Sequence, residues 1–202
     1  MGKIQAVVFD LYGTLIYLPR HRAFSKLFLD LGLTREETLK AKTIAMTETF
    51  DSIGDLVAKI RPKEKGDFST YEGLIAQEVA LVKPFSDTYE TLSMLRDKKI
   101  EMGVISNFGT PYVEPFYTLG LKQWISLRVF SCHVGLIKPW PDIYRLMLRS
   151  LGEQPEHVLM VGDNHKNDVE GPKAVGMDAL LIDRTGQTPG SITSLRDVVR
   201  YL

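Results

Sequence analysis

The sequence predicts an α/β fold in which a Rossmann-like, doubly wound parallel sheet carries an inserted helical cap. Four short apolar runs alternate with stretches of helical periodicity, and continuous apolar runs are typical of parallel strands that are buried on both faces. Polar residues follow three of these runs directly. One long segment near the N-terminus has a helical pattern and contains no such run.

The apolar runs define the expected strands. They are residues 4–9, 100–105, 158–161 and 179–182, with a weaker fifth candidate at 127–130. The polar residues that follow three of them are Asp10, then Ser106 and Asn107, then Asp163 and Asn164. Ligands of open parallel sheets bind beyond the carboxyl ends of the strands. We therefore expect the three polar groups to meet in one crevice.

The helical segment, residues 19–83, is expected to form the cap, and residues 1–18 and 84–202 the catalytic core. The spacing of a helix capping box occurs twice in the cap segment, at Thr34 with Glu37 and at Ser69 with Glu72. Such spacing marks the start of a helix, because the two side chains bond each other's backbone N–H groups. Several short helices are therefore expected there.

Charge and cysteine content restrict the class of protein. The 25 Lys and Arg residues balance the 25 Asp and Glu residues, so no global field favours nucleic acid or an acidic membrane surface. A single cysteine, Cys132, forms no intrachain disulfide and is compatible with a reducing compartment. No run approaches the roughly 20 apolar residues that cross a bilayer, and no export signal is recognised. We expect a cytoplasmic monomer or homodimer that acts on a small molecule and binds neither nucleic acid nor membrane.

Asp10 is the strongest candidate for a catalytic residue. It follows the first expected strand within Phe9-Asp10-Leu11-Tyr12-Gly13-Thr14-Leu15. A carboxylate held there can act as a nucleophile and form an acyl-type ester or an aspartyl phosphate. An aspartate after a strand is by itself more often a turn residue or a helix cap. Here, Gly13 permits an unusual backbone angle and Thr14 offers a hydroxyl that can fix the loop.

This seven-residue segment resembles the first motif of the haloacid dehalogenase superfamily, and three later segments resemble its other motifs in the same order. Ser106 and Asn107 are similar to the second motif, and Lys138 followed by proline is similar to the third. Residues 162–168 are similar to the fourth motif of the magnesium-dependent members. The resemblance extends over the whole predicted core.

The resemblance implies a role for each of these residues. Asp10 would be the nucleophile, and Ser106 with nearby amides would hold the transferred group. The ammonium of Lys138 would offset the negative charge of nucleophile and substrate. The expected catalytic residues are Asp10, Ser106 and Lys138, and the expected substrate contacts are Tyr12, Ser106, Asn107 and Lys138.

Mg²⁺ is the expected cofactor. Two acids of the fourth motif that face a third on a neighbouring strand repel one another unless a cation relieves the repulsion. Mg²⁺ prefers oxygen ligands and binds together with substrate phosphate. We expect Asp10, the backbone carbonyl of Tyr12 and Asp163 to be its ligands. Asp168 would hold a water molecule or Lys138 beside them, and Thr14 would support the loop.

The sequence departs from the superfamily's phosphatases at Tyr12. In those enzymes the second residue after the nucleophile is usually an aspartate that protonates the leaving alcohol, and a phenol with a pKa of about 10 is a poor acid near neutral pH. Tyrosine at this position resembles the 2-haloacid dehalogenases, whose halide needs no proton. Those enzymes work without metal, however, and lack the acid found here at Asp163. They also grip the substrate carboxylate with a cap arginine, for which the candidates by residue type are Arg20, Arg22, Arg35 and Arg61.

We therefore expect Mg²⁺-dependent hydrolysis of a small phosphorylated metabolite through an aspartyl phosphate on Asp10. Dehalogenation of a 2-haloacid by the same nucleophile is the first alternative. The second is a catalytically weak regulatory protein that keeps the metal site, because residues 161–177 also resemble a branch of hydrolase-like proteins with no firmly implied substrate. A protein can keep its fold after the original catalytic activity has been lost.

Overall fold

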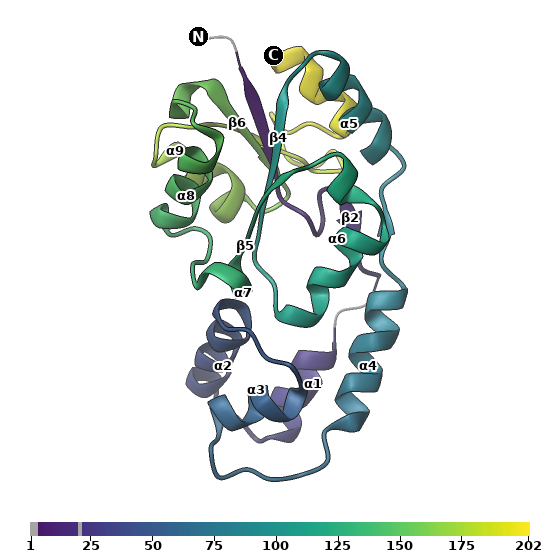
Figure 1. The fold of residues 1–202 in the computed structure, drawn as a ribbon, viewed down its shortest axis with the longest axis vertical. Coiled ribbons are helices and arrows are strands. Elements are labelled where there is room, and N and C mark those ends of the chain that lie inside the picture. The colour runs from purple at the N-terminus through teal and green to yellow at the C-terminus, as the bar shows by residue number, and fades with distance from the viewer. Residues whose placement is uncertain (1–3, 20–21) are drawn as a thin grey trace.

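The protein is built on a five-stranded parallel sheet with helices on both faces and four further helices beyond the carboxyl ends of the strands (Figure 1). The computed structural model describes residues 4–19 and 22–202. The strand order is β5-β4-β1-β6-β7. The strands are β1 (Ala6–Phe9), β4 (Glu101–Ser106), β5 (Leu127–Phe130), β6 (Val158–Gly162) and β7 (Asp178–Leu181). The predicted fold class is confirmed, with strand ends shifted by at most two residues.

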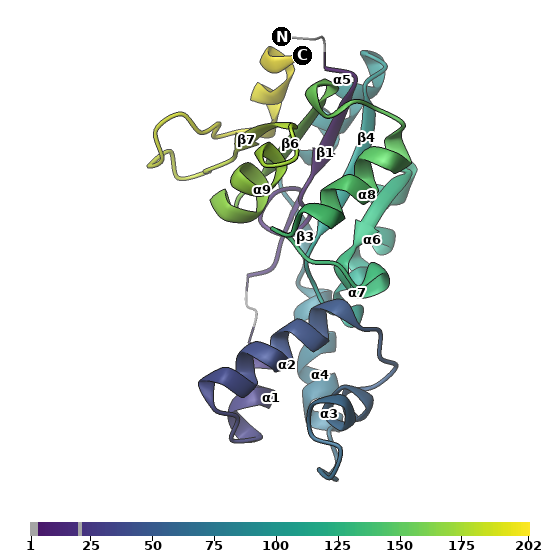
Figure 2. The ribbon, with the colours of Figure 1, turned by 90° about the vertical axis from the view of Figure 1, so that its left-hand side faces the viewer.

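The central strand β1 shows why the first apolar run is continuous. Ala6 and Val8 pack into the hydrophobic cluster beneath α8 (Pro141–Leu151), whereas Val7 and Phe9 pack into the larger cluster on the opposite face, which includes α5 (Thr88–Asp97). Figure 2 shows α8 and α9 (Gly171–Lys173) together in front of the strands. Because both faces are covered, neither set of side chains on β1 is polar.

Shorter helical segments complete the core. They are α6 (Glu114–Thr118), α7 (Ser131–Val134), a π-helical turn at His165–Glu170, and 3-10 turns at Thr110–Val113, Leu121–Gln123, Pro155–His157 and Leu195–Tyr201. Within residues 4–19 and 22–202, no helix combines the length and the apolar character that crossing a bilayer requires.

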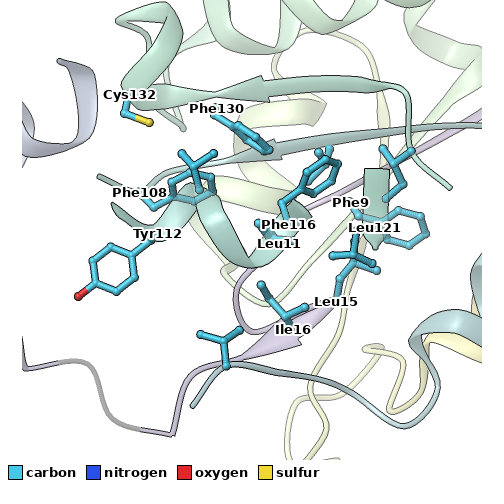
Figure 3. Close-up of a cluster of buried hydrophobic side chains, with 14 of the residues drawn as sticks. Phe9, Leu11, Leu15, Ile16, Phe108, Tyr112, Phe116, Leu121, Phe130 and Cys132 are labelled. Carbon is cyan, nitrogen blue, oxygen red and sulfur yellow. The ribbon is translucent and has the colours of Figure 1, made fainter. Parts of the chain in front are cut away.

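Large apolar side chains support the loop that follows β1. Phe9, Leu11, Leu15 and Phe116 are fully buried in one cluster, close to the rings of two further phenylalanines (Figure 3). The residues on both sides of Asp10 are therefore anchored in the core. Cys132 lies in the same cluster, and burial raises the pKa of its thiol to about 11. A thiol in this state is a packing group and not a nucleophile.

The cap consists of α1 (Ala23–Asp30), α2 (Arg35–Thr47), α3 (Ile53–Ile60) and α4 (Ser69–Ala80). It is joined to the core by β2 (Ile16–Tyr17) and β3 (Lys83–Pro84), which pair antiparallel. The sequence did not predict this pair, because two-residue strands are too short to show an alternating pattern. The division into domains at residues 18–19 and 83–84 stays a prediction.

The two expected capping boxes have different outcomes. The first is confirmed, because the Thr34 hydroxyl accepts the N–H of Glu37 at 3.2 Å and the Glu37 carboxylate accepts the N–H of Thr34 at 2.8 Å. The second is wrong, because no side chain caps α4 in this way. The carboxylate of Glu72 instead accepts the N–H of Ile53 at the start of α3, at 3.2 Å. The Glu72 side chain, which the local pattern pairs with Ser69, thus makes a contact between two cap helices instead.

A buried carboxylate ties the cap to the core. One oxygen of Glu78, on α4, accepts the N–H groups of Arg22 and Ala23 at 2.5 and 2.9 Å, at the start of α1. The other oxygen accepts the hydroxyl of Tyr112 from the core. A negative charge is favourable at a helix N-terminus, where N–H groups lack intrahelical partners. Glu78 thus holds two cap helices and one core turn together.

A second buried carboxylate, Asp87, connects the C-terminal segment to the loop after β1. It accepts two hydrogen bonds from the Arg184 guanidinium at 3.0 and 3.1 Å, one from the Ser194 hydroxyl and one from the N–H of Leu195, both at 2.9 Å. Arg184 also donates to the carbonyl of Thr14 at 2.9 Å. Burial raises the pKa of Asp87, but the hydrogen bonds outweigh burial and leave the pKa below its usual value.

Asp87→Asn should lower the free energy of unfolding by about 3 kcal/mol, because it leaves the partly buried guanidinium of Arg184 without its counter-charge. Glu90→Gln is the matched control. The Glu90–Arg196 pair has a similar separation of 2.6 Å, but both side chains are about half exposed, and such pairs contribute less than about 1 kcal/mol. Equilibrium urea denaturation of both variants measures the difference. Equal losses would show that Asp87 has no special role.

Candidate active site

Three strand ends bring the predicted site residues together. Phe9 is in register with Val104 of β4 and Val161 of β6, and the N–H of Asp10 donates to the carbonyl of Val161 at 2.9 Å. Asp10, Ser106 and Asp163 therefore leave the sheet at the same edge. Carboxylate oxygens of Asp10, Asp163 and Asp168 all lie within 4.8 Å of one another. The expected convergence of the acids is present in the structure.

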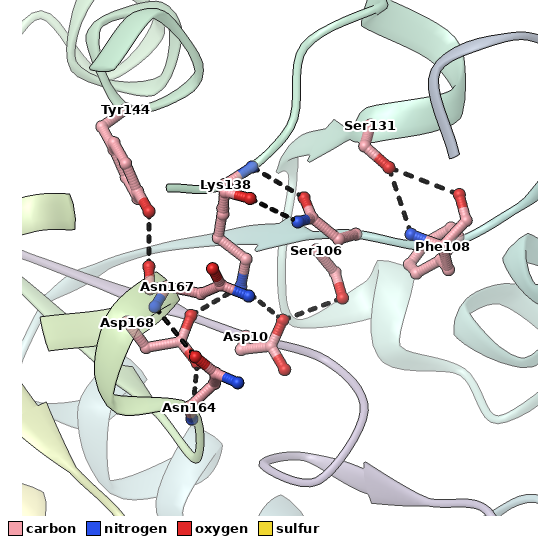
Figure 4. A network of polar contacts seen from close by, with 10 residues as sticks. Asp10, Ser106, Phe108, Ser131, Lys138, Tyr144, Asn164, Asn167 and Asp168 are labelled. Carbon is pink, nitrogen blue, oxygen red and sulfur yellow. Dashed lines mark hydrogen bonds and ion pairs between the residues drawn. The ribbon is translucent and has the colours of Figure 1, made fainter. Parts of the chain in front are cut away.

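The ammonium of Lys138 lies between Asp10 and Asp168 (Figure 4). It donates to Oδ1 of Asp10 and to Oδ1 of Asp168, each at 2.6 Å, and the residue is only 4% exposed. Burial lowers the pKa of Lys138, but the attraction of the two carboxylates outweighs burial and raises the pKa above its usual value. The side chain therefore stays an ammonium, although it is enclosed by protein.

Asp10 is oriented through one of its two oxygens. The Ser106 hydroxyl donates to Oδ1 at 2.9 Å, beside the bond from Lys138. No hydrogen bond from a described residue reaches Oδ2. One oxygen thus fixes the carboxylate, and the second is available to a ligand or to an electrophile.

Hydrogen bonds of Asn107 and Asn164 fix the groups around Lys138 and Asp168. The amide of Asn107 accepts the N–H of Lys138 and donates to its carbonyl, both at 2.9 Å. The N–H of Asn164 donates to Oδ2 of Asp168 at 3.0 Å. Both ends of the Asn107 amide are engaged with the main chain of Lys138. This side chain therefore fixes the position of the lysine, and its predicted contact with substrate stays a prediction.

The net negative charge of Asp10, Asp163, Asp168 and Lys138 favours the binding of a cation. The site holds three carboxylates and one ammonium, which pairs with two of them, so two negative charges remain when all are ionised. Asp163 is exposed to the crevice, yet the protein around it and the charges of Asp10 and Asp168 raise its pKa to about 6. A set of carboxylate oxygens with this excess of negative charge fits a hard divalent cation such as Mg²⁺.

Gly13 sets the distance between the first and fourth motifs. Its φ is +88°, and a Cβ atom added there would overlap the carboxylate of Asp163. Glycine is required on both counts, since other residues rarely adopt this conformation and none would leave room for the acid. The loop after β1 therefore lies directly against the Asp163 carboxylate. This close approach is needed if Asp10 and Asp163 are to bind the same metal ion.

The side chains of Tyr12 and Thr14 lie on either side of Gly13 in the first motif. The Tyr12 hydroxyl donates to the carbonyl of Tyr112 at 2.9 Å, and burial raises its pKa above the usual value. The Thr14 hydroxyl is buried and has no hydrogen-bond partner among the described residues. The loop is held instead by Arg184, which binds the carbonyl of Thr14. Arg184 is 170 positions from Thr14, and no pattern in the sequence signals their contact.

A cavity of about 530 Å³ lies between the cap and the crevice and reaches Asp163. Its wall is largely apolar and includes the aromatic residues Tyr12, Tyr17, Phe24, Phe28, Phe108 and Tyr112. Lys42, on α2, is its one basic residue within the described part of the chain. The sequence missed Lys42 and Tyr17, because helical periodicity does not show which cap face turns toward the crevice.

The arginines considered for a substrate carboxylate do not line this cavity in the part of the chain that the structure describes. Arg61 pairs with Glu37 at 3.4 Å on the cap surface. Arg20 lies outside the described residues. Neither Arg22 nor Arg35 is among the lining residues.

Comparison with known proteins assigns the family. The sequence of residues 4–176 matches the family model of the haloacid dehalogenase-like hydrolases. The chain belongs to this family. A relative from Oceanobacillus iheyensis, pyrophosphatase PpaX, is 30% identical over 177 residues, which cover 85% of this chain and 80% of the relative. Glyceraldehyde 3-phosphate phosphatase from Methanothermobacter thermautotrophicus is 31% identical over 195 residues, which cover 89% and 86%.

Solved structures of haloacid dehalogenase-like proteins show the same architecture. A phosphatase of this family from Thermococcus onnurineus superimposes with a TM-score of 0.68 at 25% identity, covering 98% of this chain and 97% of that one. A 2-haloacid dehalogenase from Pseudomonas syringae gives 0.67 at 18% identity, covering 98% and 100%, and at that identity the likeness concerns the fold alone. The family predicted from the four motifs is confirmed, and the chain is a hydrolase of this family.

Asp163→Asn should raise the melting temperature of the metal-free protein at pH 7.5, because it removes a carboxylate that is repelled by two others. The gain should shrink to about half at pH 5. Asp163 has a pKa of about 6 in the folded protein and about 3.9 when unfolded, so the cost of its charge is fully present above pH 6, decreases as the pH falls from 6 toward 3.9, and is absent below that.

Thermal unfolding in EDTA from pH 5 to pH 8 measures this difference. Asp51→Asn is the control, because Asp51 is exposed on the cap and its replacement should leave the melting temperature nearly unchanged. A variant of Asp163 that is less stable than wild type at pH 7.5 would contradict the electrostatic interpretation.

Proposed function

We propose that the chain is a Mg²⁺-dependent phosphatase that hydrolyses a small phosphorylated metabolite through an aspartyl phosphate on Asp10. The observation that carries the proposal is the group of three carboxylates around the buried ammonium of Lys138, with Oδ2 of Asp10 left open. Relatives with phosphatase names that align over more than four fifths of the chain support it. The cavity volume suits a small-molecule substrate. The cytoplasmic location and the monomeric or homodimeric state stay predictions.

Asp10, the carbonyl of Tyr12 and Asp163 would hold the metal ion, and Asp168 would keep Lys138 in place beside it. Bound Mg²⁺ supplies positive charge that offsets the negative charge of the phosphoryl group and of the acids. Lys138 adds a fixed positive charge on the opposite oxygen of Asp10. Positioning and charge neutralisation together provide most of the catalysis in phosphoryl transfer.

The chemistry has two steps. Oδ2 of Asp10 attacks phosphorus, and the bond from phosphorus to the leaving oxygen breaks. Ser106 and Lys138 hold Oδ1 during the attack and, with Asn107 and Tyr12, border the space of the transferred group. Water then attacks phosphorus and breaks the bond to Asp10, which restores the carboxylate and releases phosphate.

Dehalogenation of a 2-haloacid is the second candidate, and Tyr12 together with the apolar cavity favours it. Two features oppose it. The carboxylate of Asp163 borders the cavity and would repel the carboxylate of a haloacid, and no arginine lines the cavity in the part of the chain that the structure describes. We therefore place phosphate hydrolysis first.

Asp10→Asn should lower phosphate release by roughly 10³-fold or more, because the amide is a far weaker nucleophile than the carboxylate. The assay measures phosphate release from p-nitrophenyl phosphate and acetyl phosphate, with Mg²⁺ and with EDTA, beside chloride release from 2-chloropropionate. Asp51→Asn serves as control. Chloride release in EDTA would establish the dehalogenase, and wild-type turnover by Asp10→Asn would place the nucleophile elsewhere. No turnover of any phosphate would favour the regulatory protein.

Mg²⁺ should raise the melting temperature of the wild-type protein at pH 7.5, because an ion that binds only the folded state stabilises it by mass action. The Asp163→Asn variant should lose most of this response, because one of the proposed ligands is gone. Differential scanning fluorimetry across a Mg²⁺ titration measures both proteins. An equal response in the two would exclude Asp163 as a ligand.

A further inference from the structure

The described wall of the cavity above Asp163 offers an aromatic surface and few groups that carry an ionisable proton. Its ionisable lining residues, within the described chain, are Tyr12, Tyr17, Lys42, Tyr112 and Asp163. The Tyr12 hydroxyl donates to the carbonyl of Tyr112, and the Tyr112 hydroxyl donates to the carboxylate of Glu78. Each phenolic proton is therefore already engaged in a hydrogen bond to a protein oxygen.

The polar residues behind the cavity are also committed. Both oxygens of Asp168 accept hydrogen bonds, one from Lys138 and one from the N–H of Asn164. The Ser106 hydroxyl donates to Asp10. The ammonium of Lys138 is shared between two carboxylates, and as a ligand of Mg²⁺ Asp163 would be a carboxylate without a proton. Among the described residues around Asp10, no group is therefore free to protonate a departing alkoxide, and the protons of Tyr17 on β2 and Lys42 on α2 are tested by substitution below.

We propose that the substrate carries its phosphoryl group on an oxygen that leaves as a stable anion, as in an acyl or aryl phosphate, and that its organic part is apolar. This inference rests on the proposed function and specifies its substrate class. Asp10 Oδ2 forms a bond to phosphorus while the bond from phosphorus to the leaving oxygen breaks. The electron pair stays on that oxygen, which departs as a carboxylate or phenolate and needs no proton. Water then attacks phosphorus and breaks the bond to Asp10, which restores the carboxylate, and both protons of the water leave with the phosphate as H2PO4⁻.

The wall of the cavity indicates the apolar organic part. The rings of Phe24 and Phe28 are stacked with centroids 6.0 Å apart, and Phe24 meets the ring of Tyr112 edge-on at 5.6 Å. The ring of Tyr12 meets that of Phe108 in the same way at 5.7 Å. Such walls favour flat apolar groups. Lys42, as the single basic residue of the described wall, is a poor match for the several charges of inorganic pyrophosphate.

Phenyl phosphate and benzyl phosphate are the matched pair that tests the leaving group. They differ by one methylene group, but phenolate leaves unaided whereas benzyl alkoxide needs a proton. With Mg²⁺, kcat/KM should fall at least about 100-fold from phenyl to benzyl phosphate, which is the usual contribution of a general acid. Benzoyl phosphate should exceed acetyl phosphate by about tenfold, because both release a carboxylate and only the first fills the aromatic wall. Inorganic pyrophosphate should be poorer than either.

Variants identify any hidden donor. Tyr12→Asp places a carboxyl group at the edge of the crevice and should raise the benzyl-to-phenyl ratio by about tenfold or more. Tyr17→Phe and Lys42→Gln should leave that ratio unchanged. A selective loss of benzyl phosphate turnover in either one would reveal a proton donor and overturn the inference. Should Tyr12→Asp fail to fold, the wild-type ratio alone decides.

Different results would contradict the substrate class and the phosphatase activity. Phosphate release that depends on Asp10 but is similar for phenyl and benzyl phosphate, within about tenfold, would overturn the substrate class and leave the phosphatase intact. Acetyl phosphate turnover equal to that of benzoyl phosphate would overturn the apolar organic part. The absence of Asp10-dependent phosphate release from every compound would overturn the phosphatase itself.

Discussion

The buried ammonium of Lys138, shared by Asp10 and Asp168, is the interaction on which the rest of the site depends. Two carboxylates this close, both almost fully buried, would repel each other without a positive charge between them. Lys138 itself would lose its proton in this enclosure without the two acids. The three groups therefore stabilise one another, and the geometry of the site is fixed as a unit.

That unit is held from outside by contacts that span most of the chain. Asn107 binds both polar groups of the Lys138 main chain, and Arg184 joins the loop after β1 to Asp87. Glu78 extends the same support into the cap, because it binds the start of α1 and the hydroxyl of Tyr112, whose carbonyl in turn accepts the hydroxyl of Tyr12. The position of the cap and the position of the loop that carries Asp10 are therefore mechanically connected.

Tyr12 separates the first motif of this chain from the pattern that the superfamily's phosphatases usually have. Its relatives by name include phosphatases, and dehalogenases share its fold, so the overall architecture does not choose between the two reactions. The choice rests on local chemistry. Asp163 adds negative charge that a divalent ion offsets. The Tyr12 hydroxyl, which is hydrogen-bonded to the protein, stands where an acid would protonate the leaving group, so we expect only leaving groups that need no proton.

The sequence by itself determined the sheet, the helical cap, the family and the identity of the acids, because buried parallel strands are continuous apolar runs and their polar ends share one edge of the sheet. It did not reveal the β2–β3 pair or the support from Glu78 and Arg184. It also left open the direction of the Tyr12 hydroxyl and which cap residues face the crevice. These features depend on contacts between residues far apart in the chain, and only the folded packing of cap against core brings such groups together.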